Sequence, residues 1–163
     1  EKYARNRIRR AGLEDKVKIK FQDYRDIAGK FDRIVSIEMI EAVGEKFWPA
    51  YFGTLKERLA RDGRIGLQAI TIADRRFDRY RKAADFIQAY IFPGGMLPSP
   101  SSIETQASAQ KLQIDNIYSF GNSYANTLAR WRERFEIAWP DIQKLGMDER
   151  FRRLWRYGVL PHQ

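Results

Sequence analysis

The stretch FDRIVSIEMIEAVG, residues 31–44, decides how the first half of the chain folds. Residues 31–37 are a short, mostly apolar run without alternation, which is typical of a β-strand covered on both faces. Glu38 and Glu41 follow, where a helix is expected to begin. Open α/β sheets bind ligands at the carboxyl ends of their strands, so these carboxylates are candidate functional groups. The alternative is that they only favour the positive end of the next helix.

Segments on both sides of this strand alternate between helix and strand patterns. We expect helices over residues 1–13 and 49–63, with Gly12 suited to end the first, and strands over residues 16–22 and 64–72. In KVKIKFQ, residues 16–22, lysines alternate with apolar residues, as in a half-buried strand at a sheet edge. This order predicts an α/β fold with a parallel sheet.

The second half of the chain is expected to be mainly helical. Apolar residues recur at helical spacing over residues 75–92, 123–139 and 148–158. The intervening PGGMLPSPSS, residues 93–102, is a flexible loop that either forms a lid over a ligand or simply connects two helices. Arginines and aromatics interleave in the last two helices, which is also seen in nucleic-acid-binding faces. The helical spacing of the aromatics favours packing instead.

The composition excludes several kinds of site. The chain has 163 residues, of which 44% are hydrophobic, enough for one domain with a core. It contains no cysteine and a single histidine, His162, so neither zinc–cysteine sites nor histidine-based triads are expected. Its net charge of +9 favours anionic partners or is simply a solvated basic exterior. No apolar run is long enough to span a membrane, and no glycine-rich phosphate-binding motif occurs.

Three separated stretches together resemble the cyclopropane fatty-acid synthase family, which includes the mycolic acid cyclopropane synthases. They are QDYRDI followed by FDRIVSIEMIEAVG, then YIFPGGMLPS, then SYANTLARWRERFEIAWP. The resemblance runs over about residues 1–160. It implies an S-adenosylmethionine-dependent methyltransferase with a class I, Rossmann-like sheet.

The resemblance also implies how the chain is divided. Residues 1–74 would form a partial Rossmann-like core, with strands 3, 4 and 5 of a seven-stranded sheet, and residues 75–163 a helical acyl-binding lid. The glycine-rich motif that precedes these strands in the family has no counterpart here, so the chain resembles a fragment. We therefore expect the isolated chain to be inactive. We also expect it to be a homo-oligomer or strand-swapped dimer, because its central strand would expose an edge.

Members of this family transfer a methyl group to the cis double bond of an unsaturated acyl chain, and loss of a proton then closes a cyclopropane ring. Bicarbonate is the base. The resemblance places the residues that hold it at Glu41, Ile70 and Tyr124, and puts Gln68 at a histidine position. The cofactor would contact Asp23, Tyr24, Ser36 and Ile37.

Gln68 leaves the product open between a ring and a methyl branch, because an amide neither carries a positive charge nor shuttles a proton. The expected substrate is a phospholipid, reached by a cytoplasmic enzyme bound peripherally to the anionic inner face of a membrane. No nucleic acid or metal is expected. The alternatives are a family methyltransferase with another substrate or no ring closure, and a non-catalytic basic domain that binds membrane or nucleic acid.

Overall fold

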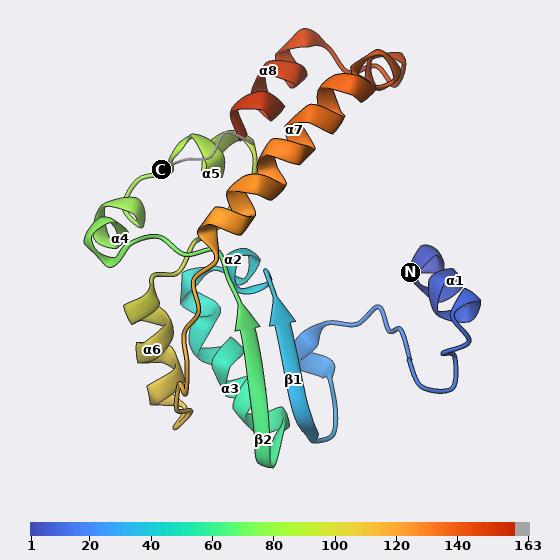
Figure 1. Ribbon diagram of the computed structural model, residues 1–163. Coiled ribbons are helices and arrows are strands. Elements are labelled where there is room, and N and C mark those ends of the chain that lie inside the picture. Colours follow the sequence, from blue (N-terminus) through green and yellow to red (C-terminus); the bar gives the residue numbers. More distant parts are fainter. Residues whose placement is uncertain (159–163) are drawn as a thin grey trace.

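In the computed structural model, which describes residues 1–158, a sheet of two parallel strands has α3 and α6 on one side, while α1 lies apart from it (Figure 1). Strand β1 (Phe31–Ile37) pairs with β2 (Leu59–Gln68), and Ile37 lies opposite Gln68 at the end of the register. Because the strands are parallel, their carboxyl ends meet at one edge of the sheet. Glu38, Glu41, Gln68 and Ile70 lie at or just beyond that edge.

Helix α3 packs against β2 and against α6, whereas α7 starts beside the carboxyl ends of the strands and then extends away from the sheet, paired with α8 (Figure 1). None of the helices within residues 1–158 is long and apolar enough to cross a membrane. The helical elements are α1 (Lys2–Arg10), η1 (Tyr24–Asp26), α2 (Ile40–Val43), η2 (Glu45–Phe47), α3 (Trp48–Arg58), α4 (Asp74–Tyr80), α5 (Phe86–Tyr90), α6 (Pro100–Ala109), α7 (Gly121–Lys144) and α8 (Glu149–Gly158).

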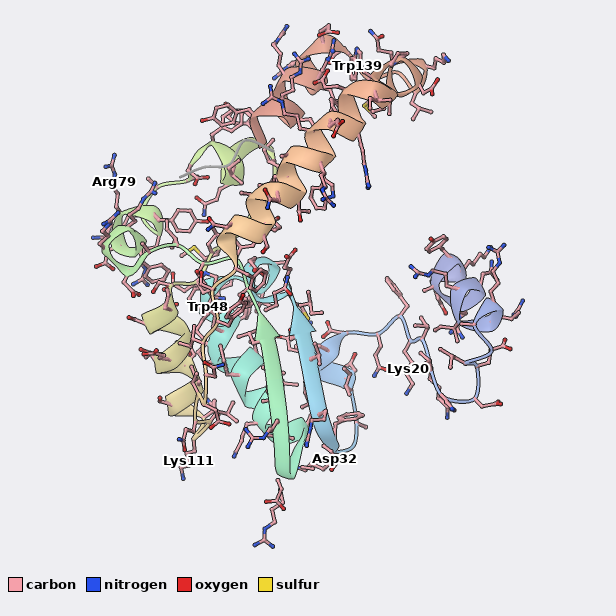
Figure 2. The ribbon with its side chains drawn as sticks, in the orientation of Figure 1. Lys20, Asp32, Trp48, Arg79, Lys111 and Trp139 are labelled. Atoms are coloured by element: carbon pink, nitrogen blue, oxygen red, sulfur yellow. The ribbon has the colours of Figure 1, made fainter. Side chains whose placement is uncertain are left out.

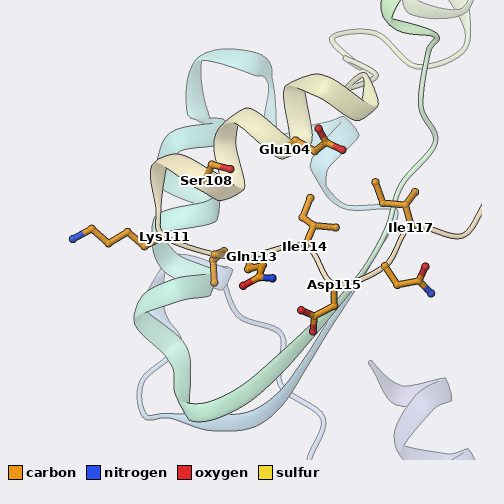
Figure 3. A pocket seen from close by; sticks show the side chains of 9 residues that line it. Glu104, Ser108, Lys111, Gln113, Ile114, Asp115 and Ile117 are labelled. Atoms are coloured by element: carbon orange, nitrogen blue, oxygen red, sulfur yellow. The ribbon is translucent and has the colours of Figure 1, made fainter.

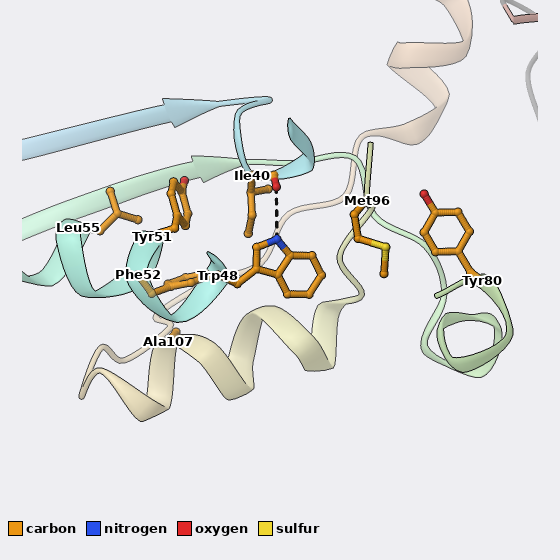
Figure 4. Packing of buried hydrophobic residues seen from close by; sticks show 8 residues of the cluster. All are labelled: Ile40, Trp48, Tyr51, Phe52, Leu55, Tyr80, Met96 and Ala107. Atoms are coloured by element: carbon orange, nitrogen blue, oxygen red, sulfur yellow. Dashed lines mark hydrogen bonds between the residues drawn. The ribbon is translucent and has the colours of Figure 1, made fainter. Parts of the chain in front are cut away.

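The hydrophobic core lies between the sheet, α3 and α6 (Figure 4). Trp48 and Tyr51 of α3 are fully buried, and each has a partner for its polar atom. The Trp48 indole N–H donates to the carbonyl of Ile40 at 3.3 Å, and the Tyr51 hydroxyl donates to Ser36 Oγ at 2.7 Å. Burial of both aromatic side chains thus leaves no unpaired donor in the centre of the core.

The strand predicted over residues 16–22 is absent from the structure, so that prediction was wrong. The segment between α1 and η1 runs apart from the sheet, with Lys20 on it (Figure 2), and Phe21 is 94% exposed. A strand needs a hydrogen-bonded neighbour, and alternation alone does not supply one. The outer edge of β1 has no neighbour among the described residues, as expected. Val35 and Ile37, which share one face of the strand, are exposed, so the expectation of a strand covered on both faces was wrong.

Two boundaries differ from the sequence prediction. The helix expected over residues 49–63 ends at Arg58, and the chain becomes extended at Leu59, so Gly63 lies inside β2. Strand β2 therefore starts earlier than expected and ends at Gln68. Within residues 59–63 only Leu59 pairs with β1, and the regular register starts at Arg64, so the extended conformation there includes an irregularity in the sheet.

Capping side chains explain two further differences. The helix expected over residues 75–92 is divided into α4 and α5, because Asp85 starts a new helix by accepting the Gln88 N–H at 2.8 Å. Within residues 93–102, Ser99 caps α6 by accepting the Ser102 N–H at 3.2 Å. The loop prediction there missed this capping box.

The helices α7 and α8 match the segments predicted for them, except that α8 starts at Glu149, and they pack through their aromatic residues. The rings of Phe135 and Trp155 stack with centroids 4.0 Å apart, although Trp131 remains 46% exposed. Glu136 on α7 forms salt bridges to Arg152 and Arg156 on α8, which lower its pKa to about 2. These contacts support packing over a nucleic-acid face. The histidine at position 162 lies outside the described residues.

Candidate functional site

The carboxyl ends of β1 and β2 bring four of the singled-out residues together. Glu38 directly follows β1, and Glu41 lies in the first turn of α2. Gln68 ends β2, and Ile70 lies two residues further along. The meeting of Glu41 with Gln68 and Ile70 follows from parallel pairing, which aligns the strand ends.

Glu41 is held by contacts to two separate segments. Its Oε1 accepts the backbone N–H of Ile70 at 2.6 Å, and its carbonyl accepts the N–H of Met96 at 2.8 Å. Its Oε2 is buried and has no hydrogen-bond partner within the described residues. A buried carboxylate oxygen without a partner is costly, so this atom is ready to accept a hydrogen bond from a ligand.

Glu38 and Gln68 form a second contact at the same edge. The Gln68 side-chain amide donates to Glu38 Oε1 at 3.0 Å, and the Glu38 N–H donates to the Gln68 carbonyl at 2.9 Å. Glu38 has φ of +48°, in the left-handed region that favours glycine. The strand thus ends in a strained turn that fixes both side chains.

Tyr124 reaches this edge from α7, far along the chain. It lies in the first turn of that helix and is half-buried. Burial raises the pKa of the Tyr124 hydroxyl, and the negative charges of Glu38 and Glu41 raise it further. The phenol therefore stays protonated at neutral pH and serves as a hydrogen-bond donor.

The predicted cofactor residues cluster along β1 and η1. The Tyr24 ring packs edge-on against Tyr51, with centroids 5.8 Å apart, and Tyr51 in turn donates to buried Ser36. Asp23 accepts hydrogen bonds from the Arg25 side chain and backbone N–H, and these lower its pKa to about 2. Ile37 is exposed at the end of the strand.

Sequence reasoning missed how the site is supported. Met96 holds Glu41 through its backbone, and no sequence pattern identifies a backbone donor so far along the chain. The segment around it, expected to be flexible, is packed: Met96 and Pro98 are buried. The Glu38 side chain was singled out for its position at the strand end, but its contact with Gln68 depends on the register of the sheet.

Two surface grooves lie elsewhere. One, of about 770 Å³, is bordered by α6 and residues 111–117 (Figure 3). The other, of about 370 Å³, lies between α4 and the start of α6. No predicted site residue lines either groove.

Comparison with solved structures shows the fold. A mycolic acid cyclopropane synthase, CmaA1, complexed with SAH and CTAB, has a TM-score of 0.78 at 24% identity, over 94% of this chain and 58% of that one. The cyclopropane synthase MmaA2 from Mycobacterium tuberculosis has a TM-score of 0.73 at 20% identity, over 91% of this chain and 59% of that one. The two strands are accordingly part of a Rossmann-like class I methyltransferase fold.

Comparison of sequences is more specific. Tuberculostearic acid methyltransferase UfaA1 from Mycobacterium tuberculosis is 42% identical over 156 residues, 95% of this chain and 36% of the relative. Cyclopropane-fatty-acyl-phospholipid synthase from Escherichia coli is 40% identical over 141 residues, 86% of this chain and 35% of the relative. The chain thus spans 35–36% of the length of these two relatives. The family model for mycolic acid cyclopropane synthetase matches residues 1–159, and the chain belongs to this family.

Proposed function

We propose that the protein transfers a methyl group from S-adenosylmethionine to the cis double bond of an unsaturated phospholipid acyl chain. The observation that carries this proposal is the hydrogen bonding and burial of the Glu41 carboxylate. Its carboxylate is fixed by Ile70, with one buried oxygen left free within electrostatic reach of Tyr124. A fixed negative charge stabilises positive charge that develops as an alkene is methylated.

The residues along β1 and η1 fit the adenosyl part of the cofactor, which supplies the electrophilic methyl group when bound. Asp23 is an acceptor suited to an exocyclic amine, which would share its carboxylate with Arg25, the present donor to both oxygens. Tyr24 follows it directly and adds an aromatic ring. Ile37 offers exposed apolar surface at the strand end. Ser36 is less suited than expected, because its hydroxyl is occupied by Tyr51.

A bicarbonate base also fits the residues at the strand ends. Glu41 Oε2 is free to accept a hydrogen bond from its hydroxyl, and the Tyr124 phenol is free to donate to its charged oxygens. The Ile70 N–H already donates to Glu41, so Ile70 would contribute by fixing that carboxylate. We propose that Glu41 and Tyr124 are the principal contacts.

An acyl chain that is methylated without ring closure is the second candidate product, in place of the ring; after methyl transfer and loss of a proton this branched chain is still an alkene. Gln68 stands where the family's histidine is expected and cannot relay a proton. One relative, at 42% identity, is named a tuberculostearic acid methyltransferase. Transfer of a methyl cation and loss of one proton add one CH₂ in either case, so the two products are isomers.

We further propose that the protein works at the cytoplasmic surface of an anionic membrane, with residues 1–74 as the methyltransferase core and 75–163 as the acyl-binding region. The charge of α7 and α8 supports the membrane contact. Several arginines there have no ion-pair partner among the described residues: Arg130, Arg132, Arg134, Arg150 and Arg153. Co-sedimentation with anionic vesicles that weakens with salt would support this contact, and equal binding to neutral vesicles would contradict it.

Self-association is a separate proposal, in which a second copy covers the free edge of β1. The support for it is that β1 pairs on one side only within the described residues, so its other edge carries backbone groups without a strand partner. Light scattering during gel filtration tests it, because a monomer at all concentrations would rule out this contact.

The activity is tested with the full-length protein, methyl-¹³C S-adenosylmethionine and vesicles of unsaturated phospholipid. We expect label in the lipid, and carbon NMR then separates a cyclopropane carbon from an olefinic one. Glu41→Gln should lose the product, whereas Glu133→Gln, an exposed change on α7, should retain it. Absence of labelled lipid from the wild-type protein, with cofactor binding intact, would refute the proposal.

A further inference from the structure

The contact between Glu38 and Gln68 has two parts that reinforce each other. The backbones are joined by the Glu38 N–H, which donates to the Gln68 carbonyl at 2.9 Å. The side chains are joined by the Gln68 amide, which donates to Glu38 Oε1 at 3.0 Å. Since the first bond fixes where the two residues lie, the second fixes how the Gln68 side chain is turned.

We propose that Glu38 is a positioning residue that holds the Gln68 amide in one orientation at the candidate active site. An ionised carboxylate only accepts hydrogen bonds, so the NH₂ group of Gln68 must face Glu38. The amide oxygen is then directed elsewhere, and one N–H remains for a ligand. This inference rests on the proposed function, because it assigns Gln68 a contact with the reacting groups.

The backbone of Glu38 supports a functional reason for this arrangement. The Glu38 backbone has φ of +48°, which is less favourable for a residue with a side chain than for glycine. Backbone strain of this kind is concentrated at functional sites. The residue that bears the strain also supplies the charge at this position. A glycine would relieve the backbone but would leave Gln68 without its partner.

The charge of Glu38 also acts on the rest of the site. A hydrogen bond to a carboxylate polarises the amide and increases the negative character of its oxygen. Glu38 lies within electrostatic reach of Tyr124, whose pKa it helps to raise. Loss of Glu38 therefore frees the Gln68 amide and removes one negative charge from the site.

A double-mutant cycle in the full-length protein separates positioning from charge. The variants are Glu38→Ala, Glu38→Gln, Gln68→Ala and the double alanine variant, with Glu133→Gln as the control. Glu38→Ala should lower kcat roughly tenfold with little change in KM for S-adenosylmethionine. Glu38→Gln keeps an acceptor oxygen and should recover most of the rate. The double variant should be no slower than Gln68→Ala alone.

Three outcomes of the cycle would overturn the proposal. They are an unchanged kcat in Glu38→Ala, strictly additive losses in the double variant, and a loss in Glu38→Gln as large as that in Glu38→Ala. The last would mean that charge alone matters.

Side-chain amide NMR tests the same contact without catalysis. The Gln68 NH₂ resonances, assigned by their loss in Gln68→Ala, should show one proton shifted downfield and slow to exchange. Glu38→Ala should abolish both features, whereas Glu133→Gln should not. If the wild-type protein made no lipid product but showed this signature, the proposed function would fail and the contact would stand. If product formed normally and the signature were missing, the positioning role would fail alone.

Discussion

Two replacements of Glu41, by Gln and by Ala, should affect the free energy of unfolding differently although both abolish methyl transfer. In Glu41→Gln the side-chain oxygen still accepts the Ile70 N–H, a bond of 2.6 Å in the wild-type protein. The amide NH₂ then occupies the place of Oε2, which is buried and has no partner within residues 1–158. One unpaired polar group is exchanged for another while a buried charge is removed. We expect the free energy of unfolding to stay within about 0.5 kcal/mol of wild type.

Glu41→Ala should behave differently, because it leaves the Ile70 N–H without its acceptor. Hydrogen bonds to charged groups contribute about 1.5–3 kcal/mol. Ile70 is 36% exposed, so water replaces part of the lost bond. We therefore expect a loss of about 1.5 kcal/mol, the lower end of that range.

Both variants should lose methyl transfer, and the assay must measure both properties. Urea unfolding of the full-length protein gives the change in stability, and transfer of labelled methyl to lipid gives the activity. A Glu41→Gln variant as unstable as Glu41→Ala would show that the Ile70 bond needs the charge. Near-wild-type turnover in Glu41→Gln would remove this carboxylate from the mechanism.

Three further changes test the fold. The pKa of Glu136 lies at about 2, below its ordinary value of 4.5, so its salt bridges stabilise the protein fully above about pH 4.5 and are lost as the pH falls towards 2. Thermal melts should show a melting temperature that falls over this pH range. In Glu136→Gln that fall should be smaller. Trp48→Ala should cost about 3–5 kcal/mol in urea unfolding, because the indole is fully buried; a loss under 1 kcal/mol would contradict this packing. Tyr51→Phe should cost about 1 kcal/mol by leaving the Ser36 hydroxyl unpaired, and an unchanged melting temperature would argue against that bond.

The parallel sheet was predictable because strand-like and helix-like segments alternate along the first half of the chain, and the short, mostly apolar segment 31–37 lies among them. The second strand was recognised in its latter part only, since its first residues also fit an amphipathic helix. The strand predicted over residues 16–22 was wrong because alternating lysines and apolar residues show only that the two faces of a strand would differ in polarity. They do not show whether a neighbouring strand is present to pair with it. That information lies in the rest of the sheet.

The candidate site was predictable in its residue types through the family resemblance, and in part through position. Parallel strands bring Glu41 and Gln68 together, which follows from the fold class. The hydrogen bond from Met96 to Glu41 and the contact of Glu38 with Gln68 depend on exact register and on a loop far along the chain. Neither leaves a local signature in the sequence.

The placement of Tyr124 gives the site two separate supports. Glu38 and Glu41 follow strand β1, whereas Tyr124 lies in the first turn of α7, a 24-residue helix that extends away from the sheet (Figure 1). Because Tyr124 lies in the first turn of α7, the position of its hydroxyl relative to Glu38 and Glu41 depends on how the start of that helix sits against the strand ends. A change that shifts this helix start would therefore alter the candidate site without touching either carboxylate.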